Sequence, residues 1–235
     1  MPISRREIAR LGVSSGLALA LSHAGAPLGA AAAGQPSNMT PDQVLQQLLD
    51  GNKRYVQSAS THPNLSAEGR MALAAGQSPM AVILSCIDSR VPPEIVFDQG
   101  LGNMLVGRTG GNVVDDTQLG GIEFGITTYS TPLVVIMGHQ RCGAIEAAVD
   151  TINSGSQAPG HIAALVDLLE PAVTIAAPQS GDQVDNTVRA NIQLGAGRIR
   201  DAHPIIAEAI ASGSLKVVGM YYSLDTGMVE VISGG

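Results

Sequence analysis

Two short runs of aliphatic residues dominate the hydrophobic pattern of the chain. The first covers residues 81–86 and the second residues 133–138, and both contain β-branched side chains. Runs of this kind are typical of strands that are buried on both faces of a parallel sheet. The carboxyl ends of such strands form the edge at which ligands bind, so we expect the polar residues after the two runs to lie close together.

Helical periodicity separates the strands. Thr40 is expected to cap a helix that begins at Pro41 and ends near residue 57. The turn Asp225-Thr-Gly227 is predicted to join the last two strands as a hairpin. Further elements are predicted as helices at 66–75, 117–129, 141–151, 161–170 and 183–211, strands at 104–106, 216–222 and 228–232, and a glycine-rich turn at 107–112. This alternation indicates an α/β fold with a central, mostly parallel β-sheet, an antiparallel edge strand and flanking helices.

Residues 1–33 are predicted to be a signal peptide of the twin-arginine type. Arg5 and Arg6 give a basic start, residues 11–21 form a short apolar run, and four alanines at 30–33 supply a cleavage site. An amphipathic cytosolic tail is the alternative. We expect residues 34–235 to form a single domain that is exported to the periplasm or the extracellular space. No membrane span is expected in the mature protein, because the apolar run is too short for one.

The composition is that of an ordinary globular chain, with 45% hydrophobic, 14% charged and 3% aromatic residues. The core must therefore be built from Ala, Val, Ile and Leu. The net charge of −7 becomes −9 without the leader, because three of the 13 basic and one of the 20 acidic residues lie in it. Since no block of Lys or Arg is present, nucleic acid is not expected as a partner.

The two cysteines of the chain follow the two aliphatic runs. Cys86 ends the first run, and His139 and Cys142 come directly after the second. Thiolate and imidazole are preferred zinc ligands, and the His-x-x-Cys spacing lets two ligands converge from one turn. Three protein ligands are typical of a catalytic zinc site, in which the fourth position is left to water. A disulfide between the cysteines is the main alternative in an exported protein, although it would need neither the histidine nor a nearby acid.

Asp88 and Arg90 follow Cys86 closely. Two residues apart in an extended segment, they point the same way and can form a bidentate ion pair. An unpaired Asp88 could instead occupy the fourth zinc position and exclude water. We therefore predict that the pair is a latch that keeps the site open, with a purely structural ion pair as the alternative.

These residues also resemble a known family. Cys86-Ile-Asp88-Ser-Arg90 and His139-Gln-Arg-Cys142 match the Cys-x-Asp-x-Arg and His-x-x-Cys signatures of the β-class carbonic anhydrases. Segments at 97–102, 107–112 and 219–222 are similar as well, so the resemblance covers about residues 40–232. It implies reversible hydration of carbon dioxide to bicarbonate and a proton by zinc-bound hydroxide, with one Zn2+ per subunit. It also implies a homodimer or tetramer with the site near the subunit interface.

The resemblance implies roles for individual residues. Cys86, His139 and Cys142 match the zinc ligands of the family. Asp88 matches a carboxylate that either pairs with Arg90 or ligates zinc in a closed state. Gln99 matches a glutamine that hydrogen-bonds the substrate or a bound anion in some members, and its alternative is a hydrogen bond to loop backbone.

One feature departs from the family pattern. Some members bind bicarbonate in a regulatory pocket with a tryptophan, an arginine and a tyrosine. Here Ile83 stands at the tryptophan position, although Arg108 and Tyr222 match the other two. We therefore expect no bicarbonate-driven closure. Two other functions stay open, namely an exported binding or assembly module on the same scaffold and hydrolysis of carbon disulfide or carbonyl sulfide.

Overall fold

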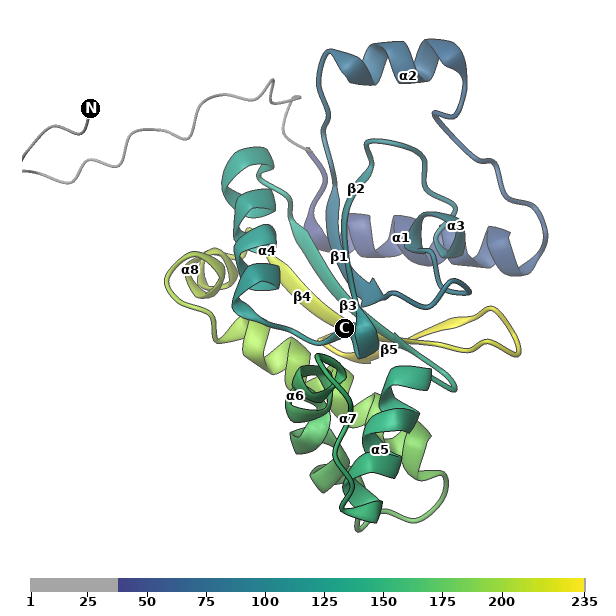
Figure 1. The fold of residues 1–235 in the computed structure, drawn as a ribbon. Helices are drawn as coiled ribbons and strands as arrows, with labels where there is room; N and C mark the ends of the chain where they lie inside the picture. Colours follow the sequence, from purple (N-terminus) through teal and green to yellow (C-terminus); the bar gives the residue numbers. More distant parts are fainter. Residues whose placement is uncertain (1–37, 235) are drawn as a thin grey trace, which may run out of the picture. The chain divides into compact units, whose positions relative to one another are not determined.

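A five-stranded sheet forms the centre of the chain (Figure 1). The computed structural model describes residues 38–234, so the predicted leader at 1–33 lies outside the described residues. The strand order is β2-β1-β3-β4-β5, in which only β5 runs antiparallel to its neighbour. The predicted sheet is therefore confirmed. Its strands are β1 (Ala81–Cys86), β2 (Met104–Thr109), β3 (Leu133–His139), β4 (Lys216–Tyr222) and β5 (Val229–Ser233).

Helices flank this sheet. Figure 1 shows α4 and α8 on one side of the strands and α1 on the other. α7 packs against β3 and β4, and α4 packs against β1 and β2. No helix among the described residues is long and apolar enough to cross a membrane. The helices are α1 (Pro41–Val56), α2 (Ala67–Ala74), α3 (Pro93–Val96), α4 (Asp116–Tyr129), α5 (Gly143–Ser154), α6 (Ile162–Ala176), α7 (Gln183–Arg200) and α8 (Ile205–Ala211), with a 3-10 turn at Gly110–Asn112.

α1 begins where the sequence predicts. The Thr40 hydroxyl accepts from the Gln43 amide at 3.3 Å, and the Gln43 side chain accepts from the Thr40 amide at 2.8 Å. This reciprocal pair satisfies two amides that have no partner inside the helix. Val44 and Leu48, one turn apart, are fully buried, so α1 lies on the core through its apolar face.

The sheet has a topological switch point between β1 and β3. β1 lies between β2 and β3, so the connections from β1 and from β3 leave toward opposite edges of the sheet. β1 pairs with β2 as far as Cys86 but with β3 only as far as Leu84. The two strands therefore separate at their carboxyl ends. In open α/β sheets such a crevice is where ligands bind.

Several predicted boundaries are wrong, among them the end of the helix predicted at 161–170, which runs on to Ala176. The helix predicted over residues 183–211 is two helices, because Pro204 has no amide hydrogen with which to continue a helix. The predicted turn at 107–112 is strand up to Thr109, since Leu84–Cys86 offer a pairing edge to these residues. The segment after Arg90, which lies outside the predicted elements, contains the short helix α3, and this helix has a proline at its first position.

Candidate metal centre

Cys86, His139 and Cys142 meet at the switch point. Cys86 is the last residue of β1, His139 is the last residue of β3, and Cys142 directly precedes α5. All three are buried, and their donor atoms lie within 4.8 Å of one another. The structure therefore brings together three residues that are 56 positions apart at most, as the strand pattern predicts.

The two cysteines are free thiols rather than a disulfide. Their sulfur atoms are 3.8 Å apart, well beyond the length of an S–S bond. The disulfide alternative is therefore not what the structure contains.

The hydrogen bonds of His139 leave one ring nitrogen for a metal ion. Nδ1 lies 3.0 Å from the carbonyl oxygen of Gln140, and because a carbonyl can only accept, Nδ1 must carry the hydrogen. Nε2 then carries no hydrogen, and its lone pair is available to bind a metal ion. It is buried and has no hydrogen-bond partner among the described residues. A buried nitrogen without a partner is costly unless something binds it, so this atom fits a metal ligand.

The two thiols also fit a cation. The Cys142 thiol favours the thiolate form of Cys86 by lying against its sulfur, and this contact lowers the pKa of Cys86 far below its ordinary value. The same contact raises the pKa of Cys142, because a second negative charge beside the first is unfavourable. The Gly111 amide donates to the Cys86 sulfur at 3.4 Å. A divalent cation would stabilise both thiolates at once, and two thiolates with one neutral imidazole are a donor set that suits zinc.

Asp88 and Arg90 form the predicted bidentate pair. Arg90 Nε donates to Asp88 Oδ1 at 2.9 Å, and Nη2 donates to Oδ2 at 2.7 Å. These bonds lower the pKa of Asp88 to about 2, so the carboxylate is ionised at neutral pH. Its Oδ2 lies 3.9 Å from His139 Nε2, yet Asp88 is not among the three clustered donors. The Asp88 carboxylate thus lies beside the three clustered donors and is held by Arg90.

Arg108 supports the same loop, a role that the sequence did not reveal. Its guanidinium donates to the carbonyl of Cys86 at 2.7 Å and to the carbonyl of Asp88 at 2.5 Å. Backbone carbonyls carry no sequence signal, so no pattern could have predicted these contacts. Arg108 fixes the backbone on both sides of the exposed Ile87 and thereby places one ligand and one carboxylate.

The arrangement around Arg108 bears on bicarbonate inhibition. Ile83 is fully buried in β1, Arg108 is engaged by the two carbonyls, and the Tyr222 hydroxyl lies 3.2 Å from that of Tyr55. The bicarbonate pocket of some family members therefore has no counterpart among the described residues, because isoleucine replaces the tryptophan and the guanidinium of Arg108 is occupied by backbone carbonyls. The resemblance implies hydration of carbon dioxide, and we expect bicarbonate to inhibit that reaction with a hyperbolic dependence. A sigmoidal curve in steady-state assays over a bicarbonate series would contradict this expectation.

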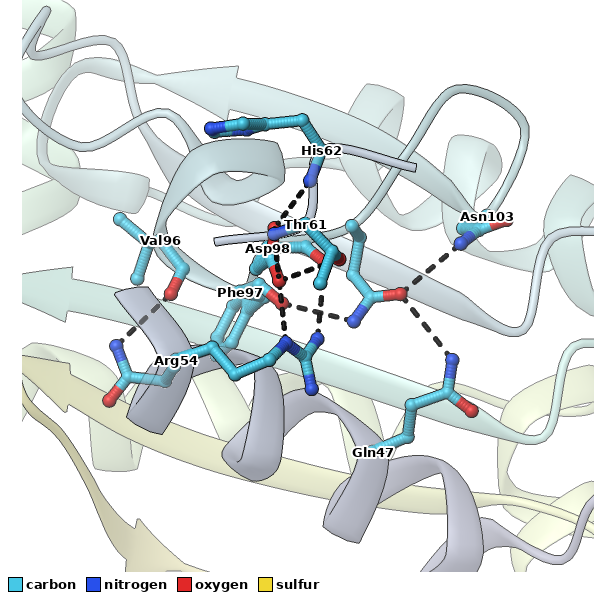
Figure 2. A network of polar contacts seen from close by, with 10 residues as sticks. Gln47, Arg54, Thr61, His62, Val96, Phe97, Asp98 and Asn103 are labelled. Carbon is cyan, nitrogen blue, oxygen red and sulfur yellow. Dashed lines mark hydrogen bonds and ion pairs between the residues drawn. The ribbon is translucent and has the colours of Figure 1, made fainter. Parts of the chain in front are cut away.

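Gln99 is not brought into hydrogen-bonding contact with the three clustered donors. Its Nε2 donates to the Phe97 carbonyl at 3.0 Å. Its Oε1 accepts from Asn103 at 3.2 Å and from Gln47 of α1 at 3.4 Å, in the network of Figure 2. The alternative, a hydrogen bond from Gln99 to loop backbone, is therefore present. A role for Gln99 toward the substrate stays a prediction.

Asn52 is a structural residue that the sequence analysis missed. Its amide donates to the carbonyls of Val96 and Gly227, and its oxygen accepts from the Val229 amide at 2.9 Å. One buried side chain thus ties α1 to α3 and to the β4–β5 hairpin. A signal was available, because Asn52 follows Leu48 by four residues on the apolar face of α1, where a polar residue needs buried partners.

The fold and the site together define a class of protein: an α/β protein with three potential metal ligands clustered at the switch point of its sheet. A family model described as carbonic anhydrase matches residues 81–229. Carbonic anhydrase 2 of Mycobacterium tuberculosis is 40% identical over 190 residues, which are 81% of this chain and 92% of that protein. The carbonic anhydrase of Mycolicibacterium smegmatis is 35% identical over 83% of this chain and 95% of its own length.

Solved structures agree in fold. A tetrameric β-carbonic anhydrase from Sordaria macrospora has a TM-score of 0.63 at 22% identity, over 82% of this chain and 98% of the other. The Coccomyxa β-carbonic anhydrase has a TM-score of 0.62 at 24% identity, over 80% and 86% of the two chains. The chain belongs to the β-class carbonic anhydrases, which are zinc-dependent enzymes that hydrate carbon dioxide reversibly.

Proposed function

We propose that this chain hydrates carbon dioxide at a zinc ion held by Cys86, His139 and Cys142, one ion per subunit. The observation that carries the proposal is the buried Nε2 of His139, which has no partner among the described residues and faces two thiols. Bound zinc would supply a Lewis acid that activates water toward carbon dioxide. Cys86, His139 and Cys142 would hold the ion, and a set of three protein ligands is typical of a catalytic zinc site that is open to water.

Asp88 and Arg90 prepare the reacting groups in this proposal. Asp88 is ionised, so its carboxylate can accept a hydrogen bond from the attacking water and orient it. Arg90 holds both carboxylate oxygens, which prevents Asp88 from becoming a fourth ligand. The pair thereby keeps the open position free for water.

The test compares wild type with Asp88→Asn. We expect both proteins to hold one zinc ion per subunit, because Asp88 is not among the three donors. Stopped-flow hydration should fall by about 10²-fold in the variant, since a neutral amide cannot accept a proton and pairs poorly with Arg90. A binding or assembly module on this scaffold would be inactive in both forms, and wild-type activity in Asp88→Asn would reject the role given to the carboxylate.

We also propose that the chain is exported and assembles as a homodimer or a pair of dimers. The paired arginines and the alanines at 30–33 support export, and N-terminal sequencing of protein from the cell envelope would test it. The β-carbonic anhydrase of Sordaria macrospora, which shares the fold, is tetrameric, and this supports assembly of the present chain. A monomeric mass in solution would reject the assembly.

A further inference from the structure

The turn that joins two of the ligands has a conformation that its own sequence does not favour. Gln140 and Arg141 connect His139 to Cys142, and Arg141 has a φ of +51°. This left-handed region favours glycine, and any other residue there needs support from its surroundings. The conformation reverses the chain within two residues, which lets both ligands face the same point.

Each peptide carbonyl of this turn holds a group of the metal centre. The Gln140 carbonyl accepts from His139 Nδ1 at 3.0 Å and so leaves Nε2 for the metal. The Arg141 carbonyl accepts from Arg90 Nη2 at 3.3 Å, and Arg90 in turn holds Asp88. The orientation of this turn therefore determines how the His139 imidazole is oriented and where Arg90 lies relative to Asp88.

Both side chains of the turn are held by Asp225 in the β4–β5 hairpin. Arg141 donates to the two oxygens of Asp225 at 2.6 and 3.0 Å. Gln140 donates to the same carboxylate at 2.8 Å and accepts from the Asp225 amide at 3.3 Å. Ser223 adds a further bond to the Gln140 oxygen at 3.3 Å. The hairpin thus holds Gln140 and Arg141, the two residues between His139 and Cys142, through hydrogen bonds and an ion pair.

The exposure of these groups argues against a role in overall stability. The side chains of Arg141 and Asp225 are 54% and 59% exposed. Ion pairs at such positions add little to the stability of a protein, because water and salt screen them. Their bonds do, however, restrict a turn whose carbonyls reach into the buried site.

We propose that Asp225 is a positioning residue for the metal centre. Through Gln140 and Arg141 it holds the turn that presents His139 Nε2 to zinc and fixes Arg90 against Asp88. This inference rests on the metal centre of the proposed function. It adds a group to that centre which lies 83 residues after Cys142 in sequence and touches no ligand itself.

The test measures zinc affinity in Asp225→Ala beside a matched variant, Glu230→Ala. Glu230 lies in β5 of the same hairpin and pairs with Arg189 at 3.1 Å, without contact to the turn. We expect the zinc dissociation constant of Asp225→Ala, from competition with a chromophoric chelator, to rise about 10- to 100-fold. The visible spectrum of its Co2+ form should change as well. Glu230→Ala should match wild type in both measurements.

Arg141→Gly is a second test that does not depend on how Asp225→Ala folds. Glycine accepts the positive φ but has no side chain for Asp225, so the metal-free variant should be no less stable than wild type while its zinc dissociation constant rises. Wild-type affinity and cobalt spectra in Asp225→Ala, or in Arg141→Gly if the former does not fold, would overturn the proposal. Absence of zinc binding in wild type would instead reject the proposed metal centre.

Discussion

Replacing Cys142 by serine is expected to remove zinc from the protein and to abolish hydration of carbon dioxide. Serine is close to cysteine in shape, but its hydroxyl stays protonated at neutral pH and does not replace a thiolate as a zinc ligand. With only Cys86 and His139 left, we expect zinc per subunit to fall to below about one tenth and the rate to below about 1% of wild type. Metal analysis and stopped-flow assays of the purified protein measure both.

Wild-type protein stripped of metal is the matched control for this variant. Its unfolding should resemble that of Cys142→Ser, because both lack the stabilisation that a bound ion gives to the native state. A Cys142→Ser protein that keeps one zinc per subunit, or keeps its activity, would show that the ion is bound elsewhere.

Replacing Asp98 by asparagine is expected to give the second large effect, a loss of stability. The Asp98 side chain is fully buried and accepts from the Thr61 amide, the His62 amide and Arg54 Nε at 2.9, 3.0 and 2.6 Å (Figure 2). These bonds tie α1 and the loop after it to the segment between α3 and β2. Asparagine tolerates the φ of +46° at this position, so the substitution tests the charge rather than the backbone. We expect the free energy of unfolding to fall by about 2–4 kcal/mol.

The pH dependence of this loss has a definite sign. Burial alone would raise the pKa of Asp98, but the Thr61 amide, Arg54 and the His62 amide outweigh it and hold the pKa below its ordinary value of 3.8. A group whose pKa is lowered on folding stabilises the protein above its unfolded pKa, and this stabilisation is lost as the pH falls through the folded value. The difference in the free energy of unfolding between wild type and Asp98→Asn should therefore become smaller as the pH drops below about 4.

Urea unfolding of both proteins across that range measures this difference. Asp116→Asn is the matched control, because Asp116 pairs with Arg198 at 3.0 Å but is 97% exposed. That variant should change stability little at any pH, since water screens its charge. A constant difference between wild type and Asp98→Asn from neutral to acidic pH would contradict the proposed ionised network.

Local patterns account for much of what could be predicted. The aliphatic runs revealed β1 and β3 because a strand buried on both faces is almost continuously apolar. Thr40 revealed the start of α1 because a cap involves only residues three apart. The cluster of Cys86, His139 and Cys142 was predictable because each residue lies at the end of a strand of a parallel sheet or just after it, and the carboxyl ends of parallel strands meet at one edge.

The sheet and the cluster of Cys86, His139 and Cys142 could be predicted from the sequence because strand patterns place these residues at one edge of a parallel sheet, and the Asp88–Arg90 pair because the two residues are close along the chain. The tertiary structure was needed to reveal the environment of Asp98, the partners of Asn52 and the hydrogen bonds from Gln140 and Arg141 to Asp225. It also placed Gln99 against α1 instead of beside the donors. These contacts join groups 36 to 177 positions apart, several of them backbone amides and carbonyls, which come together only once the sheet has formed. The partner of such a hydrogen bond cannot be inferred from the local pattern around the residue that makes it.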